Sequence, residues 1–199
     1  MEPSRSFGIV ILAAGNSSRL GEPKQLLQFK GNSLIRNVAE AALAIESNNV
    51  VIVTGANDAL VSQELEDLKV HLAPNPDWQE GMGSSIRAGL SKLLLLDPNT
   101  DFIIIAVSDQ PFVTSEIFQK LIRNGNAATG AIVACAYQNV TGTPVLFKKK
   151  YFDALLNLKG AEGAKKLLKQ FKNDVSTVPF PQGEVDIDTK EDYEKLLQS

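Results

Sequence analysis

The fold is decided by the stretch Leu12-Ala13-Ala14-Gly15-Asn16-Ser17-Ser18-Arg19-Leu20-Gly21-Glu22-Pro23-Lys24-Gln25-Leu26-Leu27, which begins where the apolar run Phe7–Leu12 ends. A run that is apolar at every position is typical of a strand in a parallel sheet covered on both faces. Ligands bind beyond the carboxyl ends of such strands. Gly15 and Gly21 can adopt positive φ angles, and the small residues beside Gly15 let a ligand approach the backbone. The stretch therefore predicts a ligand-binding loop at the carboxyl edge of an α/β sheet.

The sequence around this loop alternates between short β-branched runs and amphipathic stretches. Strands are expected over Phe7–Leu12, Val50–Val53, Phe102–Val107 and Ala131–Ala136, and helices over Ser33–Ile45, Ala56–Leu68, Ser84–Leu96 and Ser115–Asn124. We expect Ser33 to cap its helix. Such alternation implies right-handed crossovers. It predicts an α/β fold with a mostly parallel central sheet.

The pattern changes after about residue 140, but no Pro/Gly/Ser-rich linker separates the two parts. We expect a strand, two short helices, an edge strand and a terminal helix over Thr143–Phe147, Lys148–Leu156, Gly160–Gln170, Val175–Val178 and Lys190–Leu197. A chain of 199 residues fits one domain comfortably. The prediction is a single domain spanning residues 1–199.

Composition excludes several classes of function. Twenty Lys+Arg against 23 Asp+Glu give a net charge of -3, which offers no basic field for nucleic acid or an anionic membrane. The single cysteine and single histidine leave no internal disulfide, no His-based metal centre and little scope for a Ser-His-Asp triad. Any metal must therefore be held by oxygen, which favours magnesium or manganese. With no targeting segment apparent, we expect a soluble cytoplasmic protein.

The loop carries two cations, Arg19 and Lys24, with Pro23 presetting the turn before the lysine. Successive backbone N–H groups can surround phosphate oxygens while the cations supply positive charge. Neither a dinucleotide fingerprint nor a G-x-x-x-x-G-K-[ST] loop is present. The alternative interpretation is a strand–helix turn with two solvated basic residues.

Carboxylates suited to Mg²⁺ follow in two places. Asp109 comes directly after the run Phe102–Val107, where a carboxylate would face the ligand crevice, or else would cap the following turn. Asp186 and Asp188 lie two apart on an extended segment and share one face. We take Asp188 as the preferred second ligand and Asp186 as the reserve. Alternatively, the pair Asp188-Thr189 simply caps the terminal helix.

The segment 81–85, Gly-Met-Gly-Ser-Ser, precedes a helix and suits recognition of a base, a ribose or an anion. Capping by Ser84 or Ser85 is the alternative. Asn75, just upstream, could offer amide hydrogen bonds to a pyrimidine edge.

The loop 12–27 resembles the pyrophosphorylase loop of nucleotidyltransferases, and the chain resembles the molybdenum-cofactor nucleotidyltransferases, more closely the cytidylyl than the guanylyl branch. Segments 75–85, 108–113, 142–145 and 186–189 carry the same resemblance. It implies a three-layer Rossmann-like fold of the nucleotide-diphospho-sugar-transferase type. The nucleotide-binding part would cover about residues 7–140 and the acceptor-facing part about 141–199.

The implied reaction is Mg²⁺-dependent transfer of CMP from CTP to molybdopterin with release of pyrophosphate, Mn²⁺ being an alternative ion. Arg19, Lys24 and Asp109 would be catalytic, with Asp109 and Asp188 holding the metal. Arg19 and Lys24 would also bind the nucleotide, together with Leu12, Ala13, Ala14, Gly15, Thr54, Asn75, Gly83 and Ser84. Segment 160–166 resembles an element near the pterin substrate, so Lys165 would bind the acceptor, although Glu162 and Lys165 replace the usual Asp and Arg.

Three alternatives to this function stay open. One is a nucleotidyltransferase for another phosphorylated acceptor, such as a sugar or polyol phosphate. Another is an oxidoreductase, as some relatives of the family are described. The third is a non-catalytic carrier that delivers the cofactor. In the preferred reading the partners are CTP, the molybdopterin cofactor and, transiently, a molybdoenzyme or its chaperone.

Overall fold

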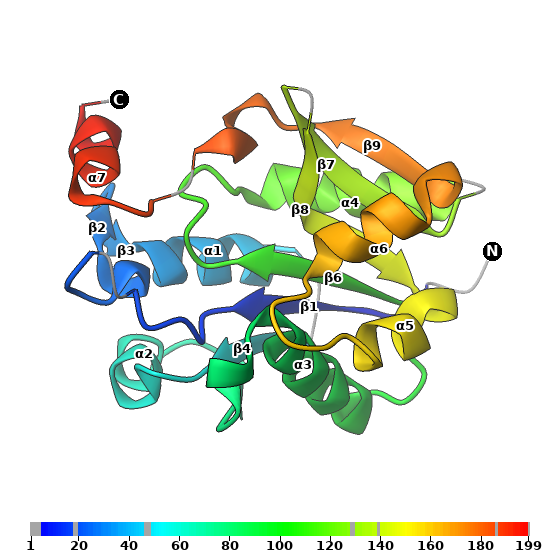
Figure 1. Ribbon diagram of the computed structural model, residues 1–199, viewed down its shortest axis with the longest axis horizontal. Coiled ribbons are helices and arrows are strands. Elements are labelled where there is room, and N and C mark those ends of the chain that lie inside the picture. Colours follow the sequence, from blue (N-terminus) through cyan, green and yellow to red (C-terminus); the bar gives the residue numbers. More distant parts are fainter. Residues whose placement is uncertain are drawn as a thin grey trace.

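Figure 1 shows the computed structural model, which describes residues 5–17, 20–45, 49–127, 130–138, 140–185 and 187–198. A seven-stranded sheet has the order β5-β4-β1-β6-β8-β7-β9. Its strands are β1 (Phe7–Leu12), β4 (Val50–Thr54), β5 (His71–Pro74), β6 (Phe102–Val107), β7 (Ile132–Tyr137), β8 (Val140–Lys148) and β9 (Val175–Pro179). Only β8 among them runs antiparallel to its neighbours, β6 and β7. The expected mostly parallel α/β sheet is confirmed.

Helices cover both faces of this sheet. They are α1 (Leu34–Leu43), α2 (Asp58–Glu64), α3 (Met82–Leu96), α4 (Ser115–Ala127), α5 (Phe152–Leu156), α6 (Ala164–Gln170) and α7 (Lys190–Leu197). A small antiparallel hairpin, β2 (Gln28–Phe29) with β3 (Asn32–Ser33), stands apart from the main sheet. In Figure 1 helix α7 lies beside this hairpin, at the end of the molecule to which β1 points.

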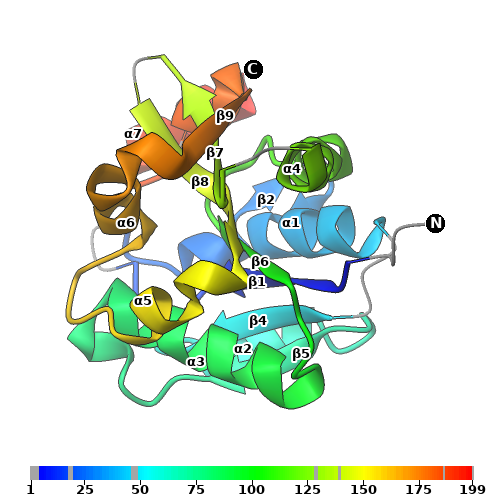
Figure 2. The ribbon, with the colours of Figure 1, turned by 90° about the vertical axis from the view of Figure 1, so that its right-hand side faces the viewer.

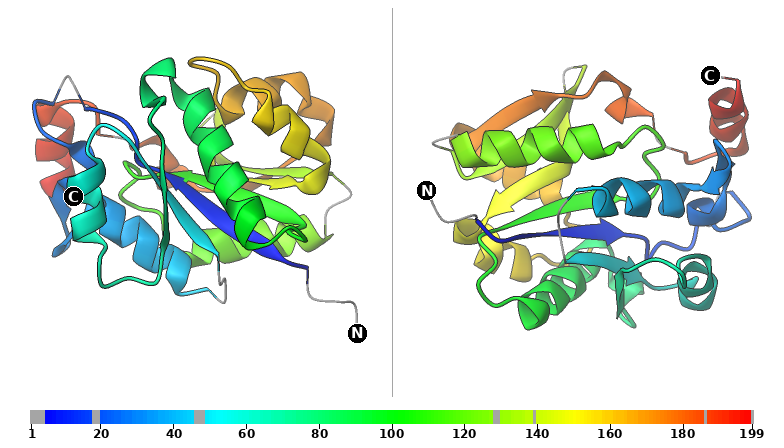
Figure 3. Two further views of the ribbon diagram at one scale, coloured as in Figure 1. Left: turned by 90° about the horizontal axis from the view of Figure 1, so that it is seen from below. Right: turned by 180° about the vertical axis from the view of Figure 1, so that it is seen from behind.

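The strands divide their side chains between two hydrophobic layers. Ile9 and Ile11 of β1 pack in the layer that also contains residues of α1, α2 and α4. Val10 and Leu12 pack in the opposite layer, with residues of α3, α5 and α6. Figure 2 shows α1 and α4 on one side of the sheet and α5 and α6 on the other, and Figure 3 shows α3 running beside α5. Burial on both faces explains why the strand is apolar at every position.

The elements expected from periodicity agree with the structure most closely where one pattern is unbroken. The bounds of β1, β6 and α7 coincide with the expected runs. Ser33 caps α1, its hydroxyl accepting a hydrogen bond of 3.2 Å from the backbone N–H of Arg36. Helix α3 begins at Met82, earlier than the expected Ser84, and α6 begins at Ala164, later than the expected Gly160. The sequence analysis did not predict β5 or the β2–β3 hairpin, which are short.

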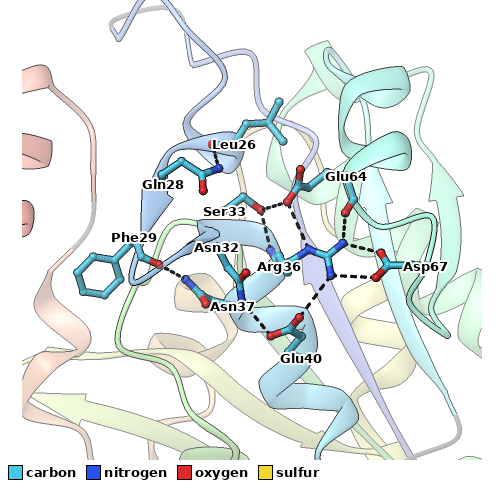
Figure 4. Close-up of polar contacts among 10 residues, drawn as sticks. All are labelled: Leu26, Gln28, Phe29, Asn32, Ser33, Arg36, Asn37, Glu40, Glu64 and Asp67. Atoms are coloured by element: carbon cyan, nitrogen blue, oxygen red, sulfur yellow. Dashed lines mark hydrogen bonds and ion pairs between the residues drawn. The ribbon is translucent and has the colours of Figure 1, made fainter.

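Arg36 joins α1 to the end of α2 (Figure 4). Its guanidinium lies 2.5 Å from the carboxylate of Asp67 and 3.4 Å from that of Glu64, and it donates to the Glu64 carbonyl at 2.7 Å. The hydrogen bond from Arg36 lowers the pKa of Asp67, and the same contact raises the pKa of Arg36. This cluster fixes two helices on one face of the sheet and takes no part in the cavities described below.

None of the described helices is long and apolar enough to span a bilayer. Strands β8, β7 and β9, which come last in the chain, belong to the same sheet as β1. The carboxyl ends of β1 and β6, which are hydrogen-bonded neighbours, therefore set where the loop of residues 12–27 and the segment after residue 107 meet.

Candidate functional site

Lys24 lies where three distant parts of the chain meet. It begins a short 3-10 helix, Lys24–Leu26, directly after Pro23. Its ammonium nitrogen is 2.5 Å from Oδ2 of Asp109 and 3.1 Å from Oδ1 of Asp188. The lysine and Asp109 side chains are 20% and 16% exposed, whereas Asp188 is 49% exposed. The structure thus brings together three residues that the sequence analysis had placed in the site.

The charge on Lys24 is stabilised by these neighbours. Burial by itself lowers the pKa of the ammonium group, but the attraction and hydrogen bonds of Asp109 and then Asp188 outweigh it, so the pKa ends above its ordinary value. Lys24 is therefore protonated throughout the neutral range. It carries the positive charge that a phosphate-binding role requires.

Asp109 reaches Lys24 because the loops after β1 and β6 are tied together. The backbone N–H of Ser108 donates to the carbonyl of Leu12 at 3.2 Å, which sets the next residue beside the loop of residues 12–27. Asp109 is thus placed at the carboxyl edge of the sheet, where α/β proteins bind ligands. Its carboxylate forms an ion pair with Lys24, which favours the site interpretation over the turn cap.

Asp188 is available to Lys24 because another residue caps α7. The Thr189 hydroxyl accepts from the backbone N–H of Asp192, and the Asp192 carboxylate accepts from the backbone N–H of Thr189, which completes a capping box. The capping alternative is therefore confirmed at Thr189, while the carboxylate of Asp188 contacts Lys24 instead. The reserve ligand Asp186 lies outside the described residues.

Gln25 shapes the loop, and the sequence analysis did not single it out. Its amide nitrogen donates to the carbonyls of Ala13 at 2.9 Å and Gly15 at 2.7 Å, and the residue is only 1% exposed. The hydroxyl of Ser17 accepts from the backbone N–H of Lys24 at 2.9 Å. These bonds fix the two halves of the loop against each other. An amide next to the lysine was visible in the sequence, but nothing in the pattern showed that it turns inward.

The two loop glycines behave differently. Gly21 adopts a φ of 81°, which the sequence analysis allowed for, whereas Gly15 stays outside the left-handed region. A Cβ atom added to Gly15 would meet nothing within 4 Å, so the backbone there borders open space. Arg19, the other expected cation of this loop, lies outside the described residues.

A cavity of about 360 Å³ opens beside Lys24. The expected residues that line it are Leu12, Ala14, Gly15, Lys24 and Asp109; Trp78, Gln79, Gly81, Met82 and Ser85 form another part of the wall. Ala14 and Trp78 pack around Gly55, where an added Cβ would come within 3 Å of both. The cavity therefore has an apolar wall as well as the charged group at Lys24.

Four residues expected to bind a nucleotide make their contacts inside the protein. The Asn75 amide donates to the hydroxyls of Ser84 at 2.9 Å and Ser85 at 3.1 Å. The backbone N–H of Gly83 donates to the carbonyl of Gly160 at 3.0 Å. Thr54 is fully buried, with its hydroxyl bonded to Asp58. The residues that line this cavity do not include Ala13, Thr54, Asn75, Gly83 or Ser84.

The start of α3 differs from the capping alternative. Gly81 is the N-cap and has no side-chain cap hydrogen bond. The Ser84 hydroxyl instead donates to the carbonyls of Gly81 at 2.8 Å and Asp77 at 2.9 Å. Capping of this helix by Ser84 or Ser85 is therefore wrong. Ser85, which we did not list among the nucleotide-binding residues, lines the cavity.

A second cavity, of about 460 Å³, adjoins the first and shares Met82, Val107 and Asp109 with it. Its other walls come from the β7–β8 hairpin, the start of α6 and residues 183–184. Lys165, the expected acceptor-binding residue, is one of its lining residues. Asp109 therefore stands between a cavity built by the first half of the chain and one built largely by its last third.

The residues around Lys24 fit a hard divalent cation. Two carboxylate oxygens, from Asp109 and Asp188, contact the same ammonium nitrogen, so both carboxylates face one point. Within the described part of the chain, no group of three or more His, Cys, Asp or Glu side chains is placed to hold a metal ion. Mg²⁺ typically takes one or two carboxylates and completes its shell with water and phosphate. The donor set is of that kind.

Comparison with known proteins agrees with this geometry. Residues 9–175 match the family model described as the MobA-like NTP transferase domain. The chain is 34% identical to nicotine blue oxidoreductase from Paenarthrobacter nicotinovorans over 69% of this chain and 65% of that protein. It is 25% identical to the molybdenum cofactor cytidylyltransferase of Escherichia coli over 92% of each. The match with the bifunctional protein GlmU of Francisella philomiragia, at 28% identity, covers 73% of this chain and 31% of that one. The chain thus spans less than two thirds of two of these relatives.

Solved structures show the same architecture. Rv0371c from Mycobacterium tuberculosis superposes with a TM-score of 0.85 at 26% identity, over 98% of this chain and 99% of that one. Its complex with manganese gives a TM-score of 0.78 over the same shares.

Proposed function

Because the chain belongs to the MobA-like NTP transferase family, we propose that it is a nucleotidyltransferase that moves CMP from CTP to a molybdopterin-type cofactor and releases pyrophosphate. The observation that carries the proposal is the Lys24 ammonium held between Asp188 and Asp109, the latter a residue that lines both cavities. The nucleotide-binding part is about residues 7–140 and the acceptor-facing part about 141–199. The E. coli cytidylyltransferase, matched over nearly its whole length, supports this substrate class.

In the proposed reaction the triphosphate lies against the backbone of residues 12–17, and Lys24 contacts its oxygens. Asp109 and Asp188 would hold Mg²⁺ or Mn²⁺, which supplies charge neutralisation for the triphosphate when bound. The acceptor phosphate, held with the help of Lys165, attacks the α-phosphorus in line, and the bond to pyrophosphate breaks. No covalent enzyme intermediate is needed, so catalysis rests on positioning and charge stabilisation. Arg19, together with Lys24, is proposed to stabilise charge in the transition state.

The choice of base is proposed to depend on Ala14. Its methyl group borders the cavity beside Trp78, which leaves less room for a purine than a glycine would. One methyl group is worth roughly 10–200-fold in discrimination, so polar contacts must add to it. We expect CTP to be preferred over GTP in kcat/KM, and Ala14→Gly to relax the preference without reversing it. Competition between the two nucleotides at equal concentration tests this, and equal use of both by the unmodified protein would contradict it.

The test of the whole proposal is pyrophosphate release from CTP in the presence of purified molybdenum cofactor. We expect Lys24→Ala and Asp109→Ala each to lower turnover by about 10²-fold or more, because charge in the transition state loses its partner. Lys120→Ala, which removes an exposed lysine of α4, is the matched control and should leave turnover unchanged. Unchanged turnover by Lys24→Ala would contradict the proposal.

A second candidate is an oxidoreductase, favoured by the 34% identity to nicotine blue oxidoreductase. The sequence lacks a dinucleotide fingerprint, which speaks against NAD(P)H as its cofactor. Titration of the protein with NADPH distinguishes the two candidates, since only the oxidoreductase needs to bind it. The alternative of a nucleotidyltransferase for another acceptor is tested by measuring pyrophosphate release with sugar and polyol phosphates. The alternative of a non-catalytic carrier is excluded if the protein forms product in a single-turnover assay.

A further inference from the structure

Two distant segments of the chain that line different cavities are bound directly to each other. Residues 78–79, 81–82 and 85 line the first cavity, and residues 161 and 163–165 line the second. The N–H of Gly83 donates to the carbonyl of Gly160 at 3.0 Å. A Cβ added to Gly81 would lie 2.6 Å from that carbonyl oxygen, and one added to Gly163 would lie 2.5 Å from Sδ of Met82. The segments therefore pack this closely because no side chain intervenes at these glycines.

Arg87 of α3 links the same two segments from a position outside both cavities. Its Nη1 donates to the carbonyl of Leu158 at 2.5 Å, and its Nη2 donates to the carboxylate of Glu80 at 2.8 Å. A guanidinium can serve both partners at once because its N–H groups point in fixed, separate directions. Since the Glu80 carboxylate is 54% exposed, this ion pair adds little stability, and its effect is to orient the guanidinium toward the carbonyl.

The turn that follows Leu158 is held together by its own hydrogen bonds. The backbone N–H of Lys159 donates to the Glu162 carboxylate at 2.9 Å, and the N–H of Glu162 donates to the Lys159 carbonyl at 3.0 Å. Because the turn keeps its shape by itself, its anchors decide where it lies: the buried Leu158 side chain and the two bonds from α3. Lys165 lies in the first turn of α6, directly after this segment, so these anchors also set its place in the second cavity.

The wall of the first cavity has a separate support. The Asn75 amide donates to the Ser84 hydroxyl at 2.9 Å, and that hydroxyl donates to the carbonyl of Asp77 at 2.9 Å. Asn75 and Ser84 are only 4% and 3% exposed, so water does not compete for these bonds. Loss of Arg87 should therefore loosen the wall of the second cavity and leave that of the first in place.

We propose that Arg87 is a positioning residue for the acceptor: by holding residues 158–163 on α3, it fixes Lys165 in the second cavity without touching either substrate. This inference rests on the proposed function, since it takes the second cavity as the acceptor site. It predicts that removal of the guanidinium impairs use of the acceptor and spares use of the nucleotide.

The first measurement is hydrogen–deuterium exchange of the full chain without ligand. In Arg87→Met the amides of residues 158–165 should exchange about tenfold faster than in the unmodified protein, while those of residues 75–85 keep their rates. Glu80→Gln, which removes the exposed partner that orients the guanidinium, should give a smaller change in the same segment and serves where Arg87→Met does not fold. Arg123→Met is the matched control, because this exposed arginine of α4 bonds the carbonyl of Gln119 in its own helix.

The second measurement is steady-state pyrophosphate release. Arg87→Met should raise KM for the molybdenum cofactor about tenfold and leave KM for CTP within about twofold. Arg87→Lys keeps the charge but reaches one partner at a time, so it should recover part of the loss.

The outcomes separate this inference from the proposed function. Equal exchange rates in Arg87→Met and the unmodified protein, faster exchange in both segments, or an equal rise in both KM values would each overturn the role of Arg87. Faster exchange confined to residues 158–165, in a protein that releases no pyrophosphate with the cofactor, would contradict the proposed function alone and support the anchoring of the second cavity by Arg87.

Discussion

At the scale of single residues, Lys24 occupies the space that a cation would take between two carboxylates. Its ammonium nitrogen contacts Asp109 and Asp188, the same oxygens that fit Mg²⁺. A lysine and a divalent ion cannot both hold these positions. In the proposed metal site the lysine would therefore compete with the ion in the absence of nucleotide, and a bound triphosphate would draw the lysine away.

This competition gives a prediction for metal binding without nucleotide. Lys24→Met removes the competing charge and leaves both carboxylates, so Mn²⁺ should bind about tenfold more tightly than to the unmodified protein, through reduced repulsion at close range. Electron paramagnetic resonance titration with Mn²⁺ alone measures it. Lys24→Arg keeps the charge and serves as the control. Unchanged or weaker Mn²⁺ binding by Lys24→Met would show that the carboxylates do not form a metal site.

Gln25 provides a prediction about positioning. Gln25→Leu keeps the size of the side chain but removes both bonds to the carbonyls of Ala13 and Gly15, so the loop loses its fixed shape. We expect kcat/KM for CTP to fall about tenfold or more, and stability to fall by about 1–3 kcal/mol. Steady-state kinetics and urea unfolding measure the two effects. Gln28→Leu, an exposed neighbour with one long hydrogen bond of 3.3 Å, should change neither.

At the scale of elements, helix α7 positions one of the two carboxylates. Leu196 is 3% exposed and packs with Ile187 against Leu27 and Phe29. The Tyr193 hydroxyl donates to the carbonyl of Gln28 at 2.9 Å. Since Asp188 immediately precedes the capped start of α7, docking of this helix on the β2–β3 hairpin carries Asp188 to Lys24.

Loosening this helix should therefore alter metal use from a distance. Leu196→Ala leaves a cavity under α7, and we expect a loss of stability of about 2–5 kcal/mol and a higher Mg²⁺ concentration for half-maximal activity. Urea unfolding and Mg²⁺ titration of the reaction measure these. Leu197→Ala is the matched control, because its side chain is 56% exposed and should cost less than about 0.5 kcal/mol. If Leu196→Ala is less stable but needs the same Mg²⁺ concentration as the unmodified protein, then docking of α7 does not position the metal site, and the prediction is wrong.

At the scale of the whole molecule, two closed hydrophobic layers shield the centre of the sheet. Cys135 in β7 is fully buried in one of them. Burial raises the pKa of its thiol from 9.0 to about 12. The fold thus keeps this thiol neutral and inaccessible.

Two consequences of this burial can be measured. The native protein should not react with a thiol reagent at pH 8, and full reaction should appear only on unfolding. Between pH 9.0 and about 12 the unfolded thiol loses its proton while the folded one keeps it, so Cys135 should lower stability as the pH rises through that range. Urea unfolding of Cys135→Ala against the unmodified protein isolates this contribution. Fast reaction of the native thiol would contradict the closed core.

What the sequence by itself determined is the chemistry that neighbouring residues carry. The apolar run of β1, the loop that follows it and the cation at Lys24 are local features, and so is Asp109 after β6. Periodicity and residue type report these directly, because strand burial and turn chemistry depend on residues close together in the chain. For that reason the α/β fold could be predicted from the sequence, and the three central residues Lys24, Asp109 and Asp188 were all among the expected site residues.

Only the tertiary structure decided which side chains turn toward the site and which turn away. Lys24 and Asp188 are 164 positions apart, and they meet because α7 docks on the β2–β3 hairpin. Asn75 and Gln25 have the same amide chemistry as Gln110, yet the amides of the first two bond to groups of the protein, whereas no residue in the described part of the chain bonds to Oε1 of Gln110. Hydrogen-bond partners of a buried amide come from distant backbone, so a local pattern carries no record of them.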